Sequence, residues 1–219
     1  MWSSEVTNMI ITGIWETLYM TLVSTLVGYV IGLPMGIILT VSDKDGIKPN
    51  AVLYKILDVI ANIVRSVPFI ILLVLLIPFT RLVVGKSYGS TATIVPLVIA
   101  AAPYIARMVE SSLKEVDAGV IEAARSMGAS NFTIITKVML VEARTSLLVG
   151  ATITLGTILG YSAMSGAVGG GGLGAIAIRY GYTRWQTDIM IVTVILLIIL
   201  FQIFHTVGMK LADKFDHRK

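Results

Sequence analysis

The sequence predicts an all-α integral membrane protein with five transmembrane helices and one short cytoplasmic helix between the third and fourth spans. Three observations predict this class. Of the 219 residues, 56% are hydrophobic and only 14% are charged, whereas a soluble domain has about 25% charged residues. Long uncharged runs recur along the chain, and most basic residues lie at the ends of these runs. We expect residues 1–219 to form a single transmembrane domain in a lipid bilayer.

Each predicted span is a run with few or no charges. About 20 helical residues are needed to cross roughly 30 Å of hydrocarbon. The five runs cover about residues 17–42, 56–79, 87–106, 146–168 and 189–209. The second run is the least clean, because Asp58 and Arg65 lie in its first half. Residues 107–144 then form the longest cytoplasmic connection.

The lysines and arginines predict that the N-terminus lies outside and the C-terminus inside. In this orientation twelve basic residues are cytoplasmic and four are external, and the opposite orientation reverses the bias. The cytoplasmic set is Lys44, Lys48, Lys55, Arg107, Lys114, Arg125, Lys137, Arg144, Lys210, Lys214, Arg218 and Lys219, and the external set is Arg81, Lys86, Arg179 and Arg184. Because this distribution is typical of membrane orientation, the net charge of +4 does not indicate nucleic-acid binding.

The first predicted span contains a stripe of small residues. Gly28, Gly32 and Gly36 form two overlapping G-x-x-x-G units. Small residues at this spacing let helices approach closely in a membrane. The stripe therefore predicts either tight packing within one chain or a dimer face, and packing within the chain is the favoured interpretation.

The odd number of spans bears on how a path across the membrane would form. Five helices cannot be divided into two equal inverted halves, which is the plan of many secondary transporters. A path would form more naturally between two copies of the chain related by a two-fold axis. Every span except the second also lacks an acidic residue at mid-depth, where ion-coupled carriers usually keep one. We therefore expect the energy source to lie outside this chain.

No group of residues in the sequence suggests catalysis or metal binding. There are no cysteines, and His205 and His217 have no neighbouring ligand set. The run "GGGGLG" at residues 169–174 matches a dinucleotide-binding fingerprint but follows a membrane span rather than a strand. The run "GKS" at residues 85–87 lacks the first glycine of a phosphate loop, since Thr80 stands there. We expect no metal, no cofactor and no enzyme activity in this chain.

A glycine cluster follows the fourth predicted span on the outer side. The stretch "YSAMSGAVGGGGLG" places six glycines within nine residues, and glycine permits a positive φ and close approach of backbones. One interpretation is a flexible loop. The other is a re-entrant turn or gate rim on which a partner lands, with Met164 as a deformable plug. The candidate gate residues are Met164, Gly169, Gly170, Gly171, Gly172 and Gly174.

Arg65, in "NIVRSVPF", is the basic residue within the second predicted span. An arginine at the bilayer centre costs about 2.5–3.5 kcal/mol on insertion scales. Extension of the side chain toward the cytoplasmic surface relieves much of this cost. Two interpretations stay open, a structural role of this kind and a position that lines an inner vestibule.

The segment "DAGVIEAARSMG" predicts a helix of about ten residues in the cytoplasmic connection. Asp117 is its expected N-cap and Gly128 its C-terminal stop. Apolar residues recur every three to four positions, whereas Glu122 and Arg125 lie on a polar face. Ser130 is the expected cap of a second helix. Because a helix of this length is marginal alone, the first one needs support from its own bundle or, as its charges favour, from a partner protein.

The same segment resembles the EAA signature of type-1 ABC importer permeases. The run E-A-A at residues 122–124 is followed by Gly128 and, after nine intervening residues, by V-M-L at residues 138–140. The usual ending I-x-L-P is altered, with valine in place of isoleucine and Val141 in place of proline. Nearly the whole chain is similar to the five-span permeases of methionine importers, in the runs "GIWETLYMT", "RSVPFIILLVLLIPFTR", "AAPYIARMVE" and "GYSAMSGAVGGGGLG".

The resemblance implies a function in transport and a set of partners. Such permeases are multi-pass proteins of the bacterial inner membrane and work as homodimers. Each copy binds one cytoplasmic ABC ATPase subunit, which holds ATP and Mg, and an extracytoplasmic binding lipoprotein delivers methionine. The alternatives are a permease of the same family for another amino acid or an osmolyte, a stand-alone secondary carrier, and a membrane scaffold without transport.

The resemblance also implies a role for the EAA helix, which in relatives is a coupling helix docked in a groove of the ATPase. The implied coupling set is Glu122, Ala123, Ala124, Met127, Gly128, Val138 and Leu140. Ala123, Ala124 and Met127 would form the docking face. Glu122 would hold the loop by hydrogen bonds, and Gly128 would allow a close turn. Closure of the ATPase pair on ATP would move this helix and open the path outward.

Overall fold

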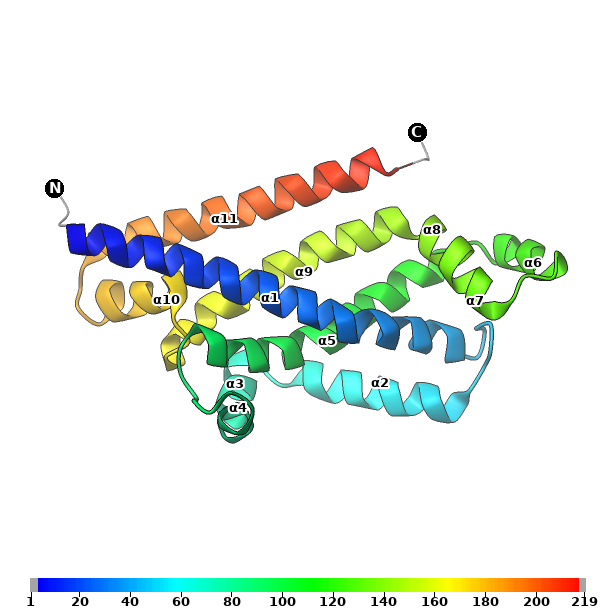
Figure 1. Ribbon diagram of the computed structural model, residues 1–219, viewed down its shortest axis with the longest axis horizontal. Helices are drawn as coiled ribbons and strands as arrows, with labels where there is room; N and C mark the ends of the chain where they lie inside the picture. The colour runs from blue at the N-terminus through cyan, green and yellow to red at the C-terminus, as the bar shows by residue number, and fades with distance from the viewer. Residues whose placement is uncertain (1–3, 217–219) are drawn as a thin grey trace.

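The computed structural model describes residues 4–216, and every regular element within this range is helical. The predicted all-α class is therefore confirmed. His217, Arg218 and Lys219, which the charge and metal predictions include, lie outside the described residues. Figure 1 shows an elongated bundle with α10 and the start of α1 at one end and α6 and α7 at the other. The connection from α1 to α2 lies at the same end as α6.

The elements follow one another in a simple order. They are α1 (Ser4–Ser42), α2 (Ala51–Ser66), α3 (Phe69–Leu75), α4 (Ile77–Val84), α5 (Ser90–Lys114), α6 (Ala118–Ser126), α7 (Asn131–Thr133), the π-helix η1 (Ile134–Met139), α8 (Leu140–Glu142), α9 (Arg144–Ser165), the 3-10 helix η2 (Gly166–Val168), α10 (Gly172–Ile176), the π-helix η3 (Ala177–Tyr182) and α11 (Thr187–Lys214). Four stretches are long and apolar enough to cross a membrane, namely Ser4–Ser42, Ser90–Lys114, Arg144–Tyr182 and Thr187–Lys214.

Helix α1 begins well before the first predicted span. The uncharged run starts after Glu16, but the helix continues back to Ser4 and includes Glu5 in its first turn. A carboxylate near a helix N-terminus is favourable because it offsets the positive end of the helix dipole. Glu16 therefore ends the uncharged run, but it does not mark the start of the helix.

The second predicted span is not one continuous helix, and the predicted count of five spans stays a prediction. Residues 56–79 are divided among α2, α3 and α4, and α2 and α3 are bent by 101° at their junction. Pro68 follows Val67, whose backbone is extended at φ −82° and ψ 124°. A residue before proline is driven out of the helical region in this way. A fifth membrane crossing is obtained only when α2 and α3 are counted together as one bent span.

Helices α1 and α5 form the most intimate contact in the bundle. A Cβ atom added at Gly32 would lie 2.6 Å from the carbonyl oxygen of Ala102, and one at Gly36 would lie 2.6 Å from that of Ala106. Only glycine lets the two backbones approach this closely. The favoured interpretation of the small-residue stripe, packing within the chain, is confirmed.

The core is centred on α5, and much of the remaining apolar surface faces outward. Leu97, Ile105 and Leu113 of α5 are fully buried. In α11, by contrast, only Ile189, Thr193 and Ala212 are buried among 28 residues. An apolar helix with so little protein cover is expected where lipid is the surrounding solvent.

Candidate coupling site

Helix α6 is closed at both ends by the residues that the sequence indicates. The Asp117 carboxylate accepts a hydrogen bond of 2.7 Å from the Gly119 amide, which makes it the N-cap. Gly128 has a φ of +81°, a left-handed conformation that favours glycine. The amide of Ala129 then donates to the carbonyl oxygen of Ala124 over 3.1 Å. The predicted cap and stop are confirmed, and α6 has a fixed direction.

One face of α6 is apolar and open to solvent. Val120 is 42% exposed and Met127 is 82% exposed, and Ala123 is exposed between them. Phe132 of α7, at 76% exposure, extends this surface. These four residues are called the exposed apolar face. Exposed apolar side chains that lie close together are typical of surfaces that contact another protein or lipid.

Ala124 does not belong to this face, which corrects the sequence prediction. Its exposure is 6%, and it packs within the buried cluster that contains Ile134 and Met139 of η1. The helix therefore turns Ala124 toward its own chain, where it fixes α6 against η1. The sequence pattern placed two adjacent alanines at the edge of the stripe and could not decide which of them faces inward.

Glu122 does not hold the loop through a hydrogen bond in this structure. Its side chain is exposed and has no hydrogen-bond partner or ion pair within residues 4–216. Arg125 makes the contact instead, because its Nη2 donates to the carbonyl oxygen of Ile47 over 3.1 Å. This bond ties α6 to the segment that joins α1 and α2.

The segment after α6 runs as one interrupted helix toward α9. The Ser130 hydroxyl accepts a hydrogen bond of 3.2 Å from the Thr133 amide, so the predicted second cap is confirmed. Val138 and Leu140 are half-buried and pack against the core cluster. Val141 is 44% exposed, and the helix is interrupted two residues later at Ala143.

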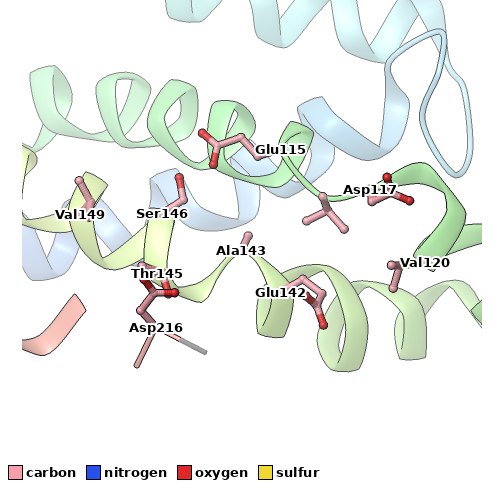
Figure 2. Close-up of a pocket in the computed structure, with 10 residues that line it drawn as sticks. Glu115, Asp117, Val120, Glu142, Ala143, Thr145, Ser146, Val149 and Asp216 are labelled. Carbon is pink, nitrogen blue, oxygen red and sulfur yellow. The ribbon is translucent and has the colours of Figure 1, made fainter. Parts of the chain in front are cut away.

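An acidic cavity of about 360 Å³ lies beside α6 (Figure 2). Four carboxylates line it: Glu115 and Asp117 from the connection between α5 and α6, Glu142 from α8, and Asp216 after α11. Val120 of the exposed apolar face lines the same cavity. The surface next to α6 is thus negative, although most charges predicted on this side of the membrane are positive.

A cluster of charged residues joins α2 to α5, and the sequence analysis missed it. The Arg107 guanidinium forms an ion pair with Asp58 of α2 and donates to Asn62 over 3.0 Å. It also pairs with Glu110 over 2.7 Å, and Glu110 pairs with Lys114 over 2.8 Å. Lys114 continues the cluster to Asp43, beyond the end of α1, over 2.6 Å. The cation that pairs with Asp58 is therefore Arg107 of α5, and the side-chain amide of Asn62 in the same helix as Asp58 also donates to the Asp58 carboxylate over 3.1 Å.

The Asp43 carboxyl at the edge of this cluster has a perturbed pKa. The hydrogen bond from Lys114 is the largest cause that lowers the pKa of Asp43, and the backbone amide of Lys44 acts in the same direction over 2.7 Å. Both donors favour the charged carboxylate.

The glycine cluster forms a packed re-entrant turn. The amide of Gly170 donates to the carbonyl oxygen of Ser165 over 2.9 Å, which turns the chain back after α9. The amide of Gly172 donates to the Glu16 carboxylate over 2.7 Å, and that of Leu173 donates to the Thr17 hydroxyl over 2.9 Å. The geometry therefore favours the re-entrant interpretation over the flexible loop.

The remaining residues of the sequence prediction lie near these elements. Met164 lies in the last turn of α9 and is 44% exposed. Gly170, Gly172 and Gly174 are buried, whereas Gly169 is exposed. A Cβ atom at Gly174 would collide with Ala163 of α9, so this glycine lets α10 pack on α9.

Arg65 lies in the last turn of α2, with an exposed side chain. Within residues 4–216 no ion pair includes it. The choice between a structural role and a vestibule role for Arg65 stays open.

These features define a class of protein: a helical membrane component with a short, capped and partly exposed helix at one end of its bundle. The chain belongs to the family described as binding-protein-dependent transport system inner membrane component, which matches residues 32–218. The sequence resemblance to this group is thereby confirmed.

Named relatives point to a particular branch of the family. The chain is 48% identical over 217 residues to the probable D-methionine transport system permease protein MetI of Vibrio cholerae, covering 99% of this chain and 96% of the relative. It is 51% identical over 158 residues to the D-methionine transport system permease protein MetI of Escherichia coli K12, covering 72% and 73%.

Solved structures agree with this assignment. A chain from the inward facing conformations of the MetNI methionine ABC transporter superposes with a TM-score of 0.96 at 49% identity, covering 99% of this chain and 100% of that one. A chain from an amino acid ABC transporter with histidines gives a TM-score of 0.73 at 22% identity. The second comparison shows a shared fold alone.

Proposed function

We propose that this chain is the permease subunit of an ATP-driven importer of methionine in the bacterial inner membrane. The observation that carries this proposal is the agreement over 99% of the chain with a methionine ABC transporter, at a TM-score of 0.96 and 49% identity. The chain shapes the path across the membrane, while a separate subunit binds ATP and Mg and hydrolyses the nucleotide.

Helix α6 is the proposed contact with that ATPase subunit. Met127 and Phe132 are 82% and 76% exposed, and side chains of this kind form the central anchors of protein interfaces. Ala124 and Arg125 fix α6 to its own chain, so a force on the exposed apolar face would reach the bundle. Glu122 is free to pair with a basic group of the partner, and Val138 and Leu140 support the helix from beneath.

The proposed topology has five spans, with α2 and α3 forming one bent span, the N-terminus outside and α6 inside. Two copies of the chain would form the path, with two ATPase subunits on the inner face. The re-entrant turn of residues 169–174 would lie at the outer rim, where a binding lipoprotein delivers the substrate. Support for this arrangement comes from Figure 1, where α6 and the glycine-rich turn lie at opposite ends of the bundle.

Uptake of labelled methionine into vesicles tests the function. Vesicles that contain the chain, its ATPase subunit and its binding protein should accumulate D- and L-methionine only when ATP is supplied. Competition with other amino acids and with osmolytes measures selectivity. Preferred uptake of a different amino acid would move the chain to another substrate in the same family, and uptake without ATP or ATPase would indicate a secondary carrier.

A further inference from the structure

Arg125 joins α6 to the segment between α1 and α2, residues 43–50, which is called the α1–α2 connection. Within residues 4–216, its 3.1 Å hydrogen bond to the carbonyl oxygen of Ile47 is the only hydrogen bond between α6 and this connection. A cavity of about 570 Å³ lies between the two segments, with Gly46, Ile121 and Glu122 in its wall. One long side chain thus crosses the cavity, while Ile47 and Ile121 pack against the buried cluster that contains Ala124.

The α1–α2 connection is hydrogen-bonded to both of the helices that it joins. Its residue Lys48 donates a backbone hydrogen bond of 3.0 Å to Val41, and Asn50 donates one of 2.9 Å to Ser42. These bonds fold the connection back on the end of α1. The Asn50 side chain also accepts from the Leu53 amide over 3.0 Å and so caps α2. A displacement of the connection therefore moves the start of α2.

Helix α2 has little packing of its own to resist such a movement. Only Ala61 is buried among its 16 residues. Polar contacts hold it instead, through the ion pair of Asp58 with Arg107 of α5 and the hydrogen bond of Tyr54 to Glu110 over 3.3 Å. Elements held by a few polar contacts can change position at a small energetic cost, whereas a packed core cannot.

We propose that Arg125 is a positioning residue that passes the movement of α6 to α2 through the α1–α2 connection. The inference rests on the proposed function, in which the ATPase moves α6. A guanidinium suits this task because its donors are fixed in a plane and its charge is permanent. The exposed apolar face receives the partner, and Arg125 on a different face carries the displacement inward.

The test uses the complete transporter in vesicles, with methionine uptake and ATP hydrolysis measured on the same preparation. The variants are Arg125→Ala and Arg125→Lys, and Lys137→Ala is the control because it removes a positive charge from an exposed position of the same loop. We expect Arg125→Ala to lower the methionine taken up per ATP hydrolysed by about fivefold or more, the lower range of measured couplings between sites. Arg125→Lys should recover part of this ratio, and Lys137→Ala should leave it unchanged.

Co-purification of the ATPase separates the possible outcomes. We expect Arg125→Ala to retain the ATPase at the same stoichiometry as the unmodified chain. An unchanged ratio of methionine taken up to ATP hydrolysed would overturn the positioning role, because Arg125 would then transmit no movement. Loss of the ATPase would also overturn it, because Arg125 would then be a docking residue. If the unmodified chain binds no ATPase, the proposed function itself fails.

A cross-link offers a second, independent check. The chain has no native cysteine, so Lys48→Cys combined with Arg125→Cys creates a unique pair on the connection and on α6. A flexible bis-thiol reagent across this pair should restore the uptake ratio that the unlinked double variant lacks. No recovery in the linked protein would contradict transmission through the α1–α2 connection.

Discussion

The contact of α1 with α5 and the attachment of α2 and α6 are made by different kinds of atoms. Between α1 and α5, glycines bring backbones together, and a Cβ atom at Gly36 would lie 2.6 Å from the Ala106 carbonyl oxygen. Helix α2 is held mainly through Arg107, and α6 is joined to the α1–α2 connection through Arg125 and to η1 through the buried Ala124. Backbone contact fixes one geometry, whereas polar tethers allow a second arrangement. The difference divides the molecule into a rigid part and a part that can move.

The largest effect on stability is expected when side-chain volume is added between α1 and α5. Gly36→Val places a branched side chain against Ala106 and Val109 of α5, and overpacking of this kind costs about 1–3 kcal/mol or more. We expect a clear fall in the Tm of the purified protein in detergent. Gly160→Val is the matched control, because nothing lies within 4 Å of its added Cβ. An equal fall in Tm for both variants would show that the α1–α5 contact is no more sensitive to added volume than an open position.

Removal of a polar tether should have a smaller effect on stability. Arg107→Gln deprives Asp58 of its cation and leaves Lys114 as the remaining cation of the nearly buried Glu110, and a hydrogen bond to a charged group contributes about 1.5–3 kcal/mol. We expect a moderate fall in Tm. Lys55→Gln, at an exposed position of α2, should leave Tm unchanged. A fall larger than that of Gly36→Val would show that α2 belongs to the rigid part.

A charge on the exposed apolar face should affect assembly and not stability. Met127→Glu buries a carboxylate in the proposed interface, and about 1.4 kcal/mol suffices for a tenfold loss of affinity. We expect at least this loss in titrations of the ATPase onto the permease, with Tm unchanged. Ser126→Glu carries the same charge to the polar face of α6 and should bind normally. Equal loss in both variants would argue against a defined docking face.

The smallest expected effect is on how the Tm of the protein depends on pH. The pKa of Asp43 is lowered, chiefly by the hydrogen bond from Lys114, so the carboxylate is more stable in the folded protein than in the unfolded chain. This contribution is complete above the unfolded pKa of about 3.9 and is lost as the pH falls through the lower folded value. Asp43→Asn should therefore flatten the dependence of Tm on pH below about pH 4. An identical acid profile for both proteins would exclude this contribution.

Local signals in the sequence predicted the helical class and the ends of α6. Asp117, Gly128 and Ser130 act on groups within a few residues of themselves, so their roles follow from the neighbouring sequence. The bend at Pro68 also had a local cause, but apolarity alone suggested a continuous span. Apolarity shows that a segment can enter a membrane and does not show that it is straight.

Contacts between distant segments could not be predicted in this way. Arg125 and Ile47 are 78 residues apart, Asp58 and Arg107 are 49 apart, and the Glu16 contact with the glycine turn joins positions 156 residues apart. Each depends on the packing of several helices at once. The burial of Ala124 is a similar case, because the position of η1 decides which of two alanines faces inward.

The length of α1 has a mechanical consequence. With 39 residues and a rise of 1.5 Å per residue, the helix is about 58 Å long, longer than the roughly 40–45 Å of a bilayer with its headgroups. Near one end, Glu16 and Thr17 hold the re-entrant glycine turn, and the other end continues into the segment that Arg125 contacts. In the proposed topology, this single helix reaches both surfaces of the membrane. In that arrangement, a displacement that enters at the α1–α2 connection would be carried along α1 to the glycine turn at the opposite rim.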